Sequence, residues 1–279
     1  MPEFTKNLFA QSLDEWGRYI EVFRNLPGSE QASFLKDQGF ASLRDLLAHV
    51  AAWWEEAAVR IRETLDRREH PPRKYNLDEF NAAALTRFRD TPEAEMIAWY
   101  EAQRQQMISL LASITDEQMK IGRVSGWLDG VILEHLKVHG PAAPRFLTID
   151  TLQREWGGCV ERFNALPPEK QAAFLKRQGF ERFRDLVAHV LAWWEEGMRV
   201  IQSASNEDPC EVPDVDAFNA DAVAKAAELP ESEVLGDFEK TRLALINLVD
   251  SLPDEVLAKP NVQEWLRADV MQHYFEHAM

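Results

Sequence analysis

The chain has 279 residues, of which 46% are hydrophobic and 28% charged, a composition typical of soluble globular proteins with one large domain or two of ordinary size. Its 31 Lys and Arg residues are outnumbered by 47 Asp and Glu residues, and the formal charge of −16 repels phosphate backbones, so we expect no nucleic-acid partner. The sequence has no long apolar run, which argues against a membrane protein, and no secretory signal at the start, which argues against an exported protein. Its two cysteines are too few for a disulfide framework, so we expect the protein in the cytoplasm.

Four stretches of the first half have apolar residues at helical spacing. Residues 13–23 and 43–57 each present one apolar face. Pro92, which follows a capping threonine, predicts the start of a third helix that runs to residue 114, and a fourth is expected from about residue 127 to a terminating glycine at 140. The proline-rich, charged residues 66–80 are expected to form a loop. Because strand alternation is absent, the sequence predicts an all-α four-helix bundle with short accessory helices.

The second half of the chain repeats the first. LDEWGRYIEVFRNLPGSEQASFLKDQGFASLRDLLAHVAAWWEE returns as LQREWGGCVERFNALPPEKQAAFLKRQGFERFRDLVAHVLAWWEE, with Trp16 and Trp156 in equivalent positions 140 residues apart. After this segment the offset is 138, as in DEFNAAA and DAFNADA, and residues 205–218 form the second expected loop. Each copy is long enough to be a domain. We therefore expect two tandem bundles, residues 1–140 and 151–279, joined by a short connection at residues 141–150.

Six of the seven histidines occupy equivalent positions in the two copies. They are His49, His135 and His139 in the first copy, and His189, His273 and His277 in the second. Two histidines four residues apart project from the same side of a helix, and the third comes from another helix, as three ligands of one ion require. Six imidazoles in bundle interiors would each cost roughly 1–3 kcal/mol if unpaired, and a metal ion removes that cost. The pattern predicts a divalent metal site in each copy, with an unmetallated polar core as the alternative.

Three neutral histidines leave a metal ion at least one open position, which is typical of catalytic sites. Such an ion lowers the pKa of bound water to about 7, or activates a thiolate. Serine or cysteine nucleophile patterns and phosphate-binding glycine loops are absent from the sequence.

Other equivalent pairs are weaker candidates. They are Glu56 and Glu196, Asn81 and Asn219, Arg104 and Arg242, and the tryptophan pairs Trp53–Trp54 and Trp193–Trp194. The glutamates are the candidate catalytic residues, able to orient a ligand or move a proton, unless they only mark the solvated end of a helix. For the asparagines we favour a structural role. The arginines either contact an anionic substrate or form ion pairs. The tryptophans are mainly core residues, and one of each pair could line a pocket.

The phrases RDLLAHVAAWW and RDLVAHVLAWW, the FN segments and the final H-x-x-x-H resemble the DinB/YfiT-like superfamily of four-helix bundles. The segments from DEFNAAALTRF and DAFNADAVAKA onwards resemble its ClbS/DfsB branch. The resemblance implies a divalent transition metal, zinc, nickel or iron, held by the two histidine triads named above. It also implies chemistry: the superfamily includes thiol-dependent transferases and isomerases, and the ClbS-like branch includes self-protection proteins that hydrolyse a strained, DNA-alkylating cyclopropane. Many members are homodimers, which a covalent tandem would mimic within one chain.

Together these features predict a metal-dependent detoxification or self-resistance enzyme. Its substrate would be a small electrophilic molecule, attacked by hydrolysis or by addition of a low-molecular-weight thiol. The alternative is a non-enzymatic protein that sequesters a hydrophobic compound, and a third possibility is that only one copy is active. The substrate, the metal, the use of a thiol and any further oligomerisation stay open.

Overall fold

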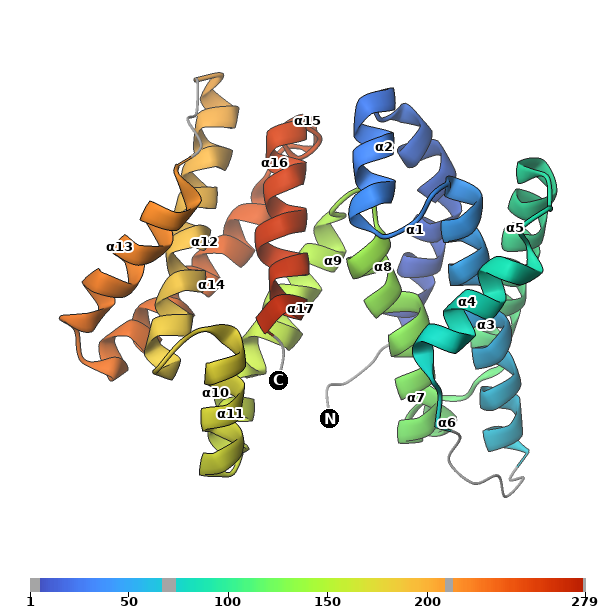
Figure 1. Ribbon diagram of the computed structural model, residues 1–279, viewed down its shortest axis with the longest axis horizontal. Helices are drawn as coiled ribbons and strands as arrows, with labels where there is room; N and C mark the ends of the chain where they lie inside the picture. The colour runs from blue at the N-terminus through green and yellow to red at the C-terminus, as the bar shows by residue number, and fades with distance from the viewer. Residues whose placement is uncertain (1–5, 67–73, 209–212, 278–279) are drawn as a thin grey trace. The chain divides into compact units, whose positions relative to one another are not determined.

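The structure is a computed structural model that describes residues 6–66, 74–208 and 213–277, and within these ranges it contains helices and no strand (Figure 1). The expected all-α class is therefore confirmed. Contacts divide the chain into two units, Met1–Pro141 and Ala142–Met279. His70 and Cys210, which the sequence places in the two loops, lie outside the described residues, and Cys159 is a free, buried thiol.

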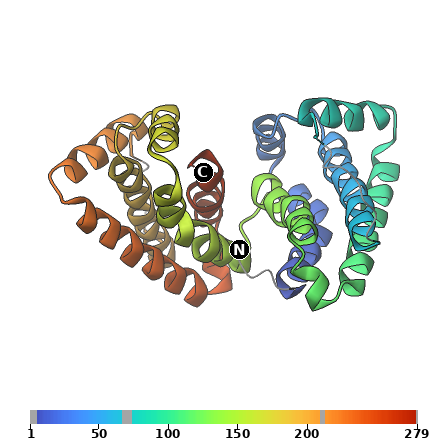
Figure 2. The same ribbon diagram turned by 90° about the horizontal axis from the view of Figure 1, so that it is seen from below.

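Four main helices build the first unit, and the fourth of them is interrupted by a π-helical segment. In chain order the elements are α1 (Lys6–Asn25), α2 (Gly28–Asp37), α3 (Leu43–Leu65), α4 (Leu77–Arg87), α5 (Glu93–Ser113), α6 (Asp116–Met119), α7 (Gly122–Leu128), the π-helical η1 (Asp129–Glu134) and α8 (His135–His139). Helix α3 packs on α5, α7 and η1, while α1 packs on α5 and η1 (Figure 2). The shared core includes Trp16 and Trp54, both fully buried.

The second unit follows the same order of elements. These are α9 (Arg145–Asp150), the π-helical η2 (Thr151–Glu155), the short 3-10 helix η3 (Trp156–Gly158), α10 (Cys159–Ala165), α11 (Pro168–Gln178), α12 (Phe183–Asn206), α13 (Val215–Ala227), α14 (Glu231–Ser251), α15 (Asp254–Leu257), α16 (Pro260–Trp265), the π-helical η4 (Leu266–Gln272) and α17 (His273–His277). Helix α12 takes the place of α3 and packs on α14, α16 and η4. The central helix of each unit thus carries the first histidine of a triad.

Some boundaries differ from the sequence prediction. The expected connection at residues 141–150 is shorter than predicted, because helix α9 begins at Arg145. Pro144 directly precedes the helix, a place where a residue without a backbone N–H breaks no helical hydrogen bond. The two expected loops end earlier than predicted, because the side chains of Asn76 and Asp214 cap α4 and α13 by accepting hydrogen bonds from backbone N–H groups. The fourth main helix begins at Gly122 rather than near residue 127.

A one-residue insertion explains why α1 is continuous but its counterpart is broken. LDEW in the first unit corresponds to LQREW in the second, so Leu13 and Leu152 are 139 residues apart whereas the tryptophans that follow are 140 apart. The extra residue falls in η2, where the wider turn of a π-helix accommodates it. The guanidinium of Arg104 donates to the carbonyl of Leu13, and that of Arg242 donates to the carbonyl of Leu152, both at 2.9 Å. The helix-to-helix contact is therefore kept in spite of the insertion.

Gly197 in α12 allows the indole ring of Trp265 to pack directly on the helix backbone. A Cβ at this position would overlap the indole ring of Trp265, which is 6% exposed. We expect Gly197→Ala to lower the free energy of unfolding by about 1–3 kcal/mol, because the indole must leave its place. Gly236→Ala in α14 is the matched control, since nothing lies within 4 Å of its added Cβ, and it should stabilise the helix by up to about 1 kcal/mol. Urea unfolding that gives both substitutions the same sign would contradict this packing.

Candidate metal centres

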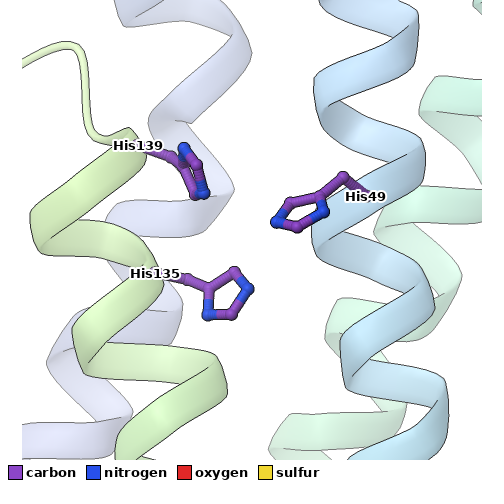
Figure 3. Close-up of side chains that lie close together, drawn as sticks. All are labelled: His49, His135 and His139. Atoms are coloured by element: carbon purple, nitrogen blue, oxygen red, sulfur yellow. The ribbon is translucent and has the colours of Figure 1, made fainter. Parts of the chain in front are cut away.

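Each unit gathers three histidines around one point. In the first unit, one ligand nitrogen each of His49, His135 and His139 lie within 4.8 Å of one another. Figure 3 shows His135 and His139 projecting from one helix toward His49 on α3. His189, His273 and His277 meet the same criterion in the second unit. The six histidines that the sequence singles out therefore form two groups of three, one in each unit.

Each pair of histidines follows a π-helical segment whose carbonyl groups accept hydrogen bonds from buried indoles. Segments η1 and η4 end directly before His135 and His273. Wider π-turns leave carbonyl groups that need other donors, and buried indoles supply them. In the first unit, Trp16 Nε1 donates to the carbonyl of Ile132 at 3.0 Å, and Trp54 Nε1 donates to that of Val131 at 2.8 Å. In the second unit, Trp156 and Trp194 donate to the equivalent carbonyls of Val270 and Asp269, at 2.9 and 3.3 Å.

Hydrogen bonds donated by the Nδ1 atoms fix two imidazoles of the first triad. His135 Nδ1 lies 2.6 Å from the carbonyl oxygen of Gly130, and His139 Nδ1 lies 2.7 Å from Oε1 of Gln38. Because these partners accept hydrogen bonds, each neutral ring carries its proton on Nδ1. Each Nε2 is then left with a free lone pair, the arrangement that metal-binding histidines use.

The second triad repeats one of these bonds and differs in the other. His277 Nδ1 lies 2.8 Å from Oε1 of Gln178, as in the first unit. The Nε2 atoms of His189 and His273 lie 2.9 Å apart, a distance at which one ring donates to the other. His277 Nε2, His189 Nδ1 and His273 Nδ1 are buried and lack a hydrogen bond of normal geometry. Such atoms cost roughly 1–3 kcal/mol each, so an ion that binds His277 Nε2 would satisfy it.

Gln38 and Gln178 are site residues that the sequence prediction missed. Each precedes a glycine with positive φ, Gly39 at 76° and Gly179 at 80°, which ends the preceding helix and turns the chain toward the triad. The next residue, a phenylalanine in both units, packs on the first histidine of the triad, with ring centroids 5.3 Å apart for Phe40 and His49. The signal was present in the sequence: Q-G-F occurs at the same place in both copies.

The environment keeps the imidazoles neutral. Burial, followed by the neighbouring histidines, lowers the pKa of His49 to about 3 and that of His139 to about 2. The same causes lower the pKa of His273 to about 3 and that of His277 to about 4. At neutral pH these side chains are therefore unprotonated ligands that need no deprotonation before they bind a cation.

The donor set fits a divalent transition metal ion. Zinc binds imidazole nitrogen at about 2.0–2.1 Å, so neighbouring ligand nitrogens in a tetrahedral site lie about 3.3 Å apart. The nitrogens of each triad, within 4.8 Å of one another, reach this spacing by small side-chain rotations. Three neutral imidazoles leave a coordination position for a further ligand.

One neighbour distinguishes the second triad from the first. Asp269 of η4 stands where the first unit has Val131, and its Oδ1 lies 4.0 Å from Nδ1 of His273. Burial, followed by the carboxylates of Glu276 and Glu264, raises the pKa of Asp269 to about 7.

The candidate catalytic glutamates are held by arginines. Arg60 Nε donates to Glu56 Oε1 at 2.7 Å, and the hydroxyl of Tyr75 donates to the same oxygen. Glu196 pairs in the same way with Arg199, at 2.9 Å. The catalytic role of the two glutamates stays a prediction.

The remaining candidates have clear structural contacts. Asn81 accepts a hydrogen bond from Trp53 Nε1 at 3.0 Å, and Asn219 accepts one from Trp193 Nε1 at 2.8 Å. The two asparagines also hydrogen-bond to His49 and His189, which raises the pKa of each histidine against the effect of burial. Arg104 and Arg242, besides their bonds to carbonyl groups, form ion pairs with glutamates one helical turn away. The arginines thus hold helices together.

Aromatic side chains line one side of the first triad. The ring of Trp53 lies 6.4 Å from that of His135, and Phe80, Tyr75 and Trp127 lie 4.1, 5.7 and 6.4 Å from Trp53. We call these four side chains, Trp53, Tyr75, Phe80 and Trp127, the aromatic cluster. In the second unit Pro213 takes the place of Tyr75, so the surroundings of the two triads differ.

We expect Gln38→Leu to weaken metal binding at the first triad by about 10- to 100-fold, because His139 loses the acceptor that fixes its tautomer and orientation. Isothermal titration with Zn²⁺ measures this change. Gln31→Leu is the control, since Gln31 bonds only backbone carbonyls of the nearby chain in the described structure. Equal affinities for the Gln38→Leu protein and the wild type would contradict the role assigned to Gln38.

The family model of the DinB superfamily matches residues 12–139, which span the first triad and the aromatic cluster. No curated protein and no solved structure gives a significant match to the chain. Among the described helices, none is both long and apolar enough to cross a membrane.

Proposed function

We propose that this chain, whose residues 12–139 match the DinB superfamily, is a tandem duplication of a DinB-like domain in which each copy holds one divalent transition metal ion. We further propose that it is a detoxification or self-resistance enzyme that acts on a small electrophilic molecule, by hydrolysis as in the ClbS-like branch or by addition of a low-molecular-weight thiol. The observation that carries the proposal is the convergence of three histidine nitrogens within 4.8 Å in both units.

The chain's own residues would bind and orient the reactants. A divalent ion on three neutral imidazoles supplies Lewis acidity and lowers the pKa of a water or thiol that binds it. The glutamine behind the third histidine holds the donor set in place, and in the first unit the aromatic cluster offers an apolar surface beside it. Glu56, held by Arg60 and Tyr75, is the carboxylate proposed to move a proton.

Product analysis tests the enzymatic function. The metal-loaded protein is incubated with an excess of an activated cyclopropane or an epoxide, with and without a small thiol, and products are counted by mass spectrometry. Enzymatic function predicts many molecules of ring-opened product per chain, and the thiol arm separates hydrolysis from thiol addition. No product beyond the uncatalysed background would overturn the proposal.

The aromatic cluster also supports the second candidate, a protein that sequesters a hydrophobic compound without turnover. Aromatic rings bury large apolar areas and bind flat ligands well. In that case the same experiment gives protection of at most a few molecules per chain and recovers the electrophile unchanged. Trp53→Ala would then abolish protection, whereas removal of the metal would leave it intact.

A further inference from the structure

The two triads hold their middle histidines in different ways. In the first unit the carbonyl oxygen of Gly130, five residues earlier in the chain, lies 2.6 Å from Nδ1 of His135. In the second unit His273 Nδ1 is buried and has no hydrogen bond of normal geometry, and Asp269 Oδ1 lies 4.0 Å away. The acceptors near His273 Nδ1 are both parts of Asp269, its backbone carbonyl and its carboxylate.

The side chain of Asp269 is 20% exposed, and the carboxylates of Glu264 and Glu276 both act on it with the same sign of charge. A mostly buried carboxylate in such surroundings is stabilised by a nearby cation or by a hydrogen bond from an N–H group.

Metal binding at His273 would fix the ring proton on Nδ1. The Nε2 atoms of His273 and His189 lie 2.9 Å apart, so one of the two rings donates to the other. When Nε2 of a neutral imidazole binds a cation, the ring proton must be on Nδ1, and a buried N–H group needs an acceptor. Asp269, one helical turn before His273, is the side chain placed to accept it.

We propose that Asp269 is a positioning residue of the second metal centre, which accepts a hydrogen bond from His273 Nδ1 when His273 binds a divalent cation. The proposal rests on metal binding by the triads, as argued above. It makes the second site dependent on a carboxylate for which the first site has no counterpart, because Val131 occupies the equivalent position. The two sites are then tuned separately, one by a backbone carbonyl and the other by a charged side chain.

Full-length protein with His135→Ala isolates the second site for the test. Its affinity for Co²⁺ is measured from the visible absorption bands of the bound ion, with a competing chelator to extend the range. Asp269→Asn, which keeps the size of the side chain, and Asp269→Val, which introduces the residue of the first unit, are compared in this background. We expect each to weaken Co²⁺ binding by about 10- to 100-fold and to shift the absorption bands, because an oriented carboxylate raises the basicity of its histidine.

The reciprocal background supplies the matched control. In full-length protein with His273→Ala only the first site is left, and Asp269→Asn there should leave Co²⁺ affinity unchanged. Far-UV circular dichroism of the same protein checks that Asp269→Asn preserves the helices of the second unit. A loss of less than threefold in the His135→Ala background, or an equal loss at the first site, would overturn the role of Asp269.

Failure of the proposed function has a different signature. If the His135→Ala protein binds no Co²⁺ while Asp269 is intact, the second triad is not a metal site, and both proposals fail for this unit. If it binds Co²⁺ equally well with and without the Asp269 carboxylate, the metal centre stands and only the positioning role is lost.

Discussion

Replacing His135 with alanine is expected to remove the metal ion of the first unit and to leave that of the second in place. The free energy of metal binding in four-ligand zinc sites is about 10–16 kcal/mol, so one ligand contributes roughly 3–4 kcal/mol, or several hundred-fold in affinity. His273→Ala should have the mirror effect, and the double substitution should abolish both binding and the proposed turnover. Metal analysis after gel filtration, together with product counting, measures these losses.

His70→Ala is the control for these substitutions, since His70 belongs to neither triad and has no counterpart in the second copy. Both ions should be retained in this variant. Turnover that falls only with His135→Ala or only with His273→Ala would identify one unit as catalytic and the other as inactive. Retention of two ions per chain in the double variant would contradict the assignment of the ligands.

The metal-free protein is expected to lose stability steeply as the pH falls below 6.5. Burial lowers the pKa of His49 to about 3 and that of His139 to about 2, whereas both titrate near 6.5 in the unfolded chain. The unfolded state therefore binds more protons over this range, so the stabilisation is complete above pH 6.5 and declines toward the folded values. Each such histidine contributes roughly 1.5 kcal/mol of this loss between pH 6.5 and 5.

Denaturant unfolding of the metal-free protein between pH 7 and 5 measures this dependence. His139→Leu should flatten the plot of unfolding free energy against pH by about 1 kcal/mol per pH unit averaged over this range, approaching about 1.4 kcal/mol per unit, the value for one proton, at its acid end. Lys6→Leu, which removes a charge on α1 outside the triads, serves as the control. A slope unaffected by His139→Leu would mean that this histidine is not kept neutral by the fold.

The helices and the triads follow from short sequence patterns, which is why the sequence predicts them well. Apolar spacing identifies the main helices because each buries one face. The i, i+4 spacing of His135 and His139 places them on one side of a helix, and recurrence in the second copy makes coincidence an insufficient explanation.

Other features depend on contacts between distant residues or on small changes of helical pitch. Gln38 reaches His139 across 101 positions of the chain, and the repeated Q-G-F segment marks Gln38 as a candidate without indicating which residue it bonds. The π-helical segments arise where carbonyl groups find indole donors from other helices, as Val131 does with Trp54. Local propensity contains no information about such partners, so these parts of the site needed the structure.

The two copies diverge around a shared donor set. Pro213 in place of Tyr75 and Asp269 in place of Val131 change the surroundings of the second triad, but the histidines and the glutamine behind them are kept. The ligands proposed for the metal ion are therefore common to the two units, whereas the side chains around them differ.

Metal content is the most direct test of the central claim that three imidazoles meet at one ion in each unit. The purified full-length protein is dialysed against zinc, nickel or iron in turn, freed of excess metal, and analysed by inductively coupled plasma mass spectrometry. The account predicts two tightly bound transition metal ions per chain for at least one of these metals, with one ion per chain if one site binds more weakly. Protein that retains none and takes up none would contradict it.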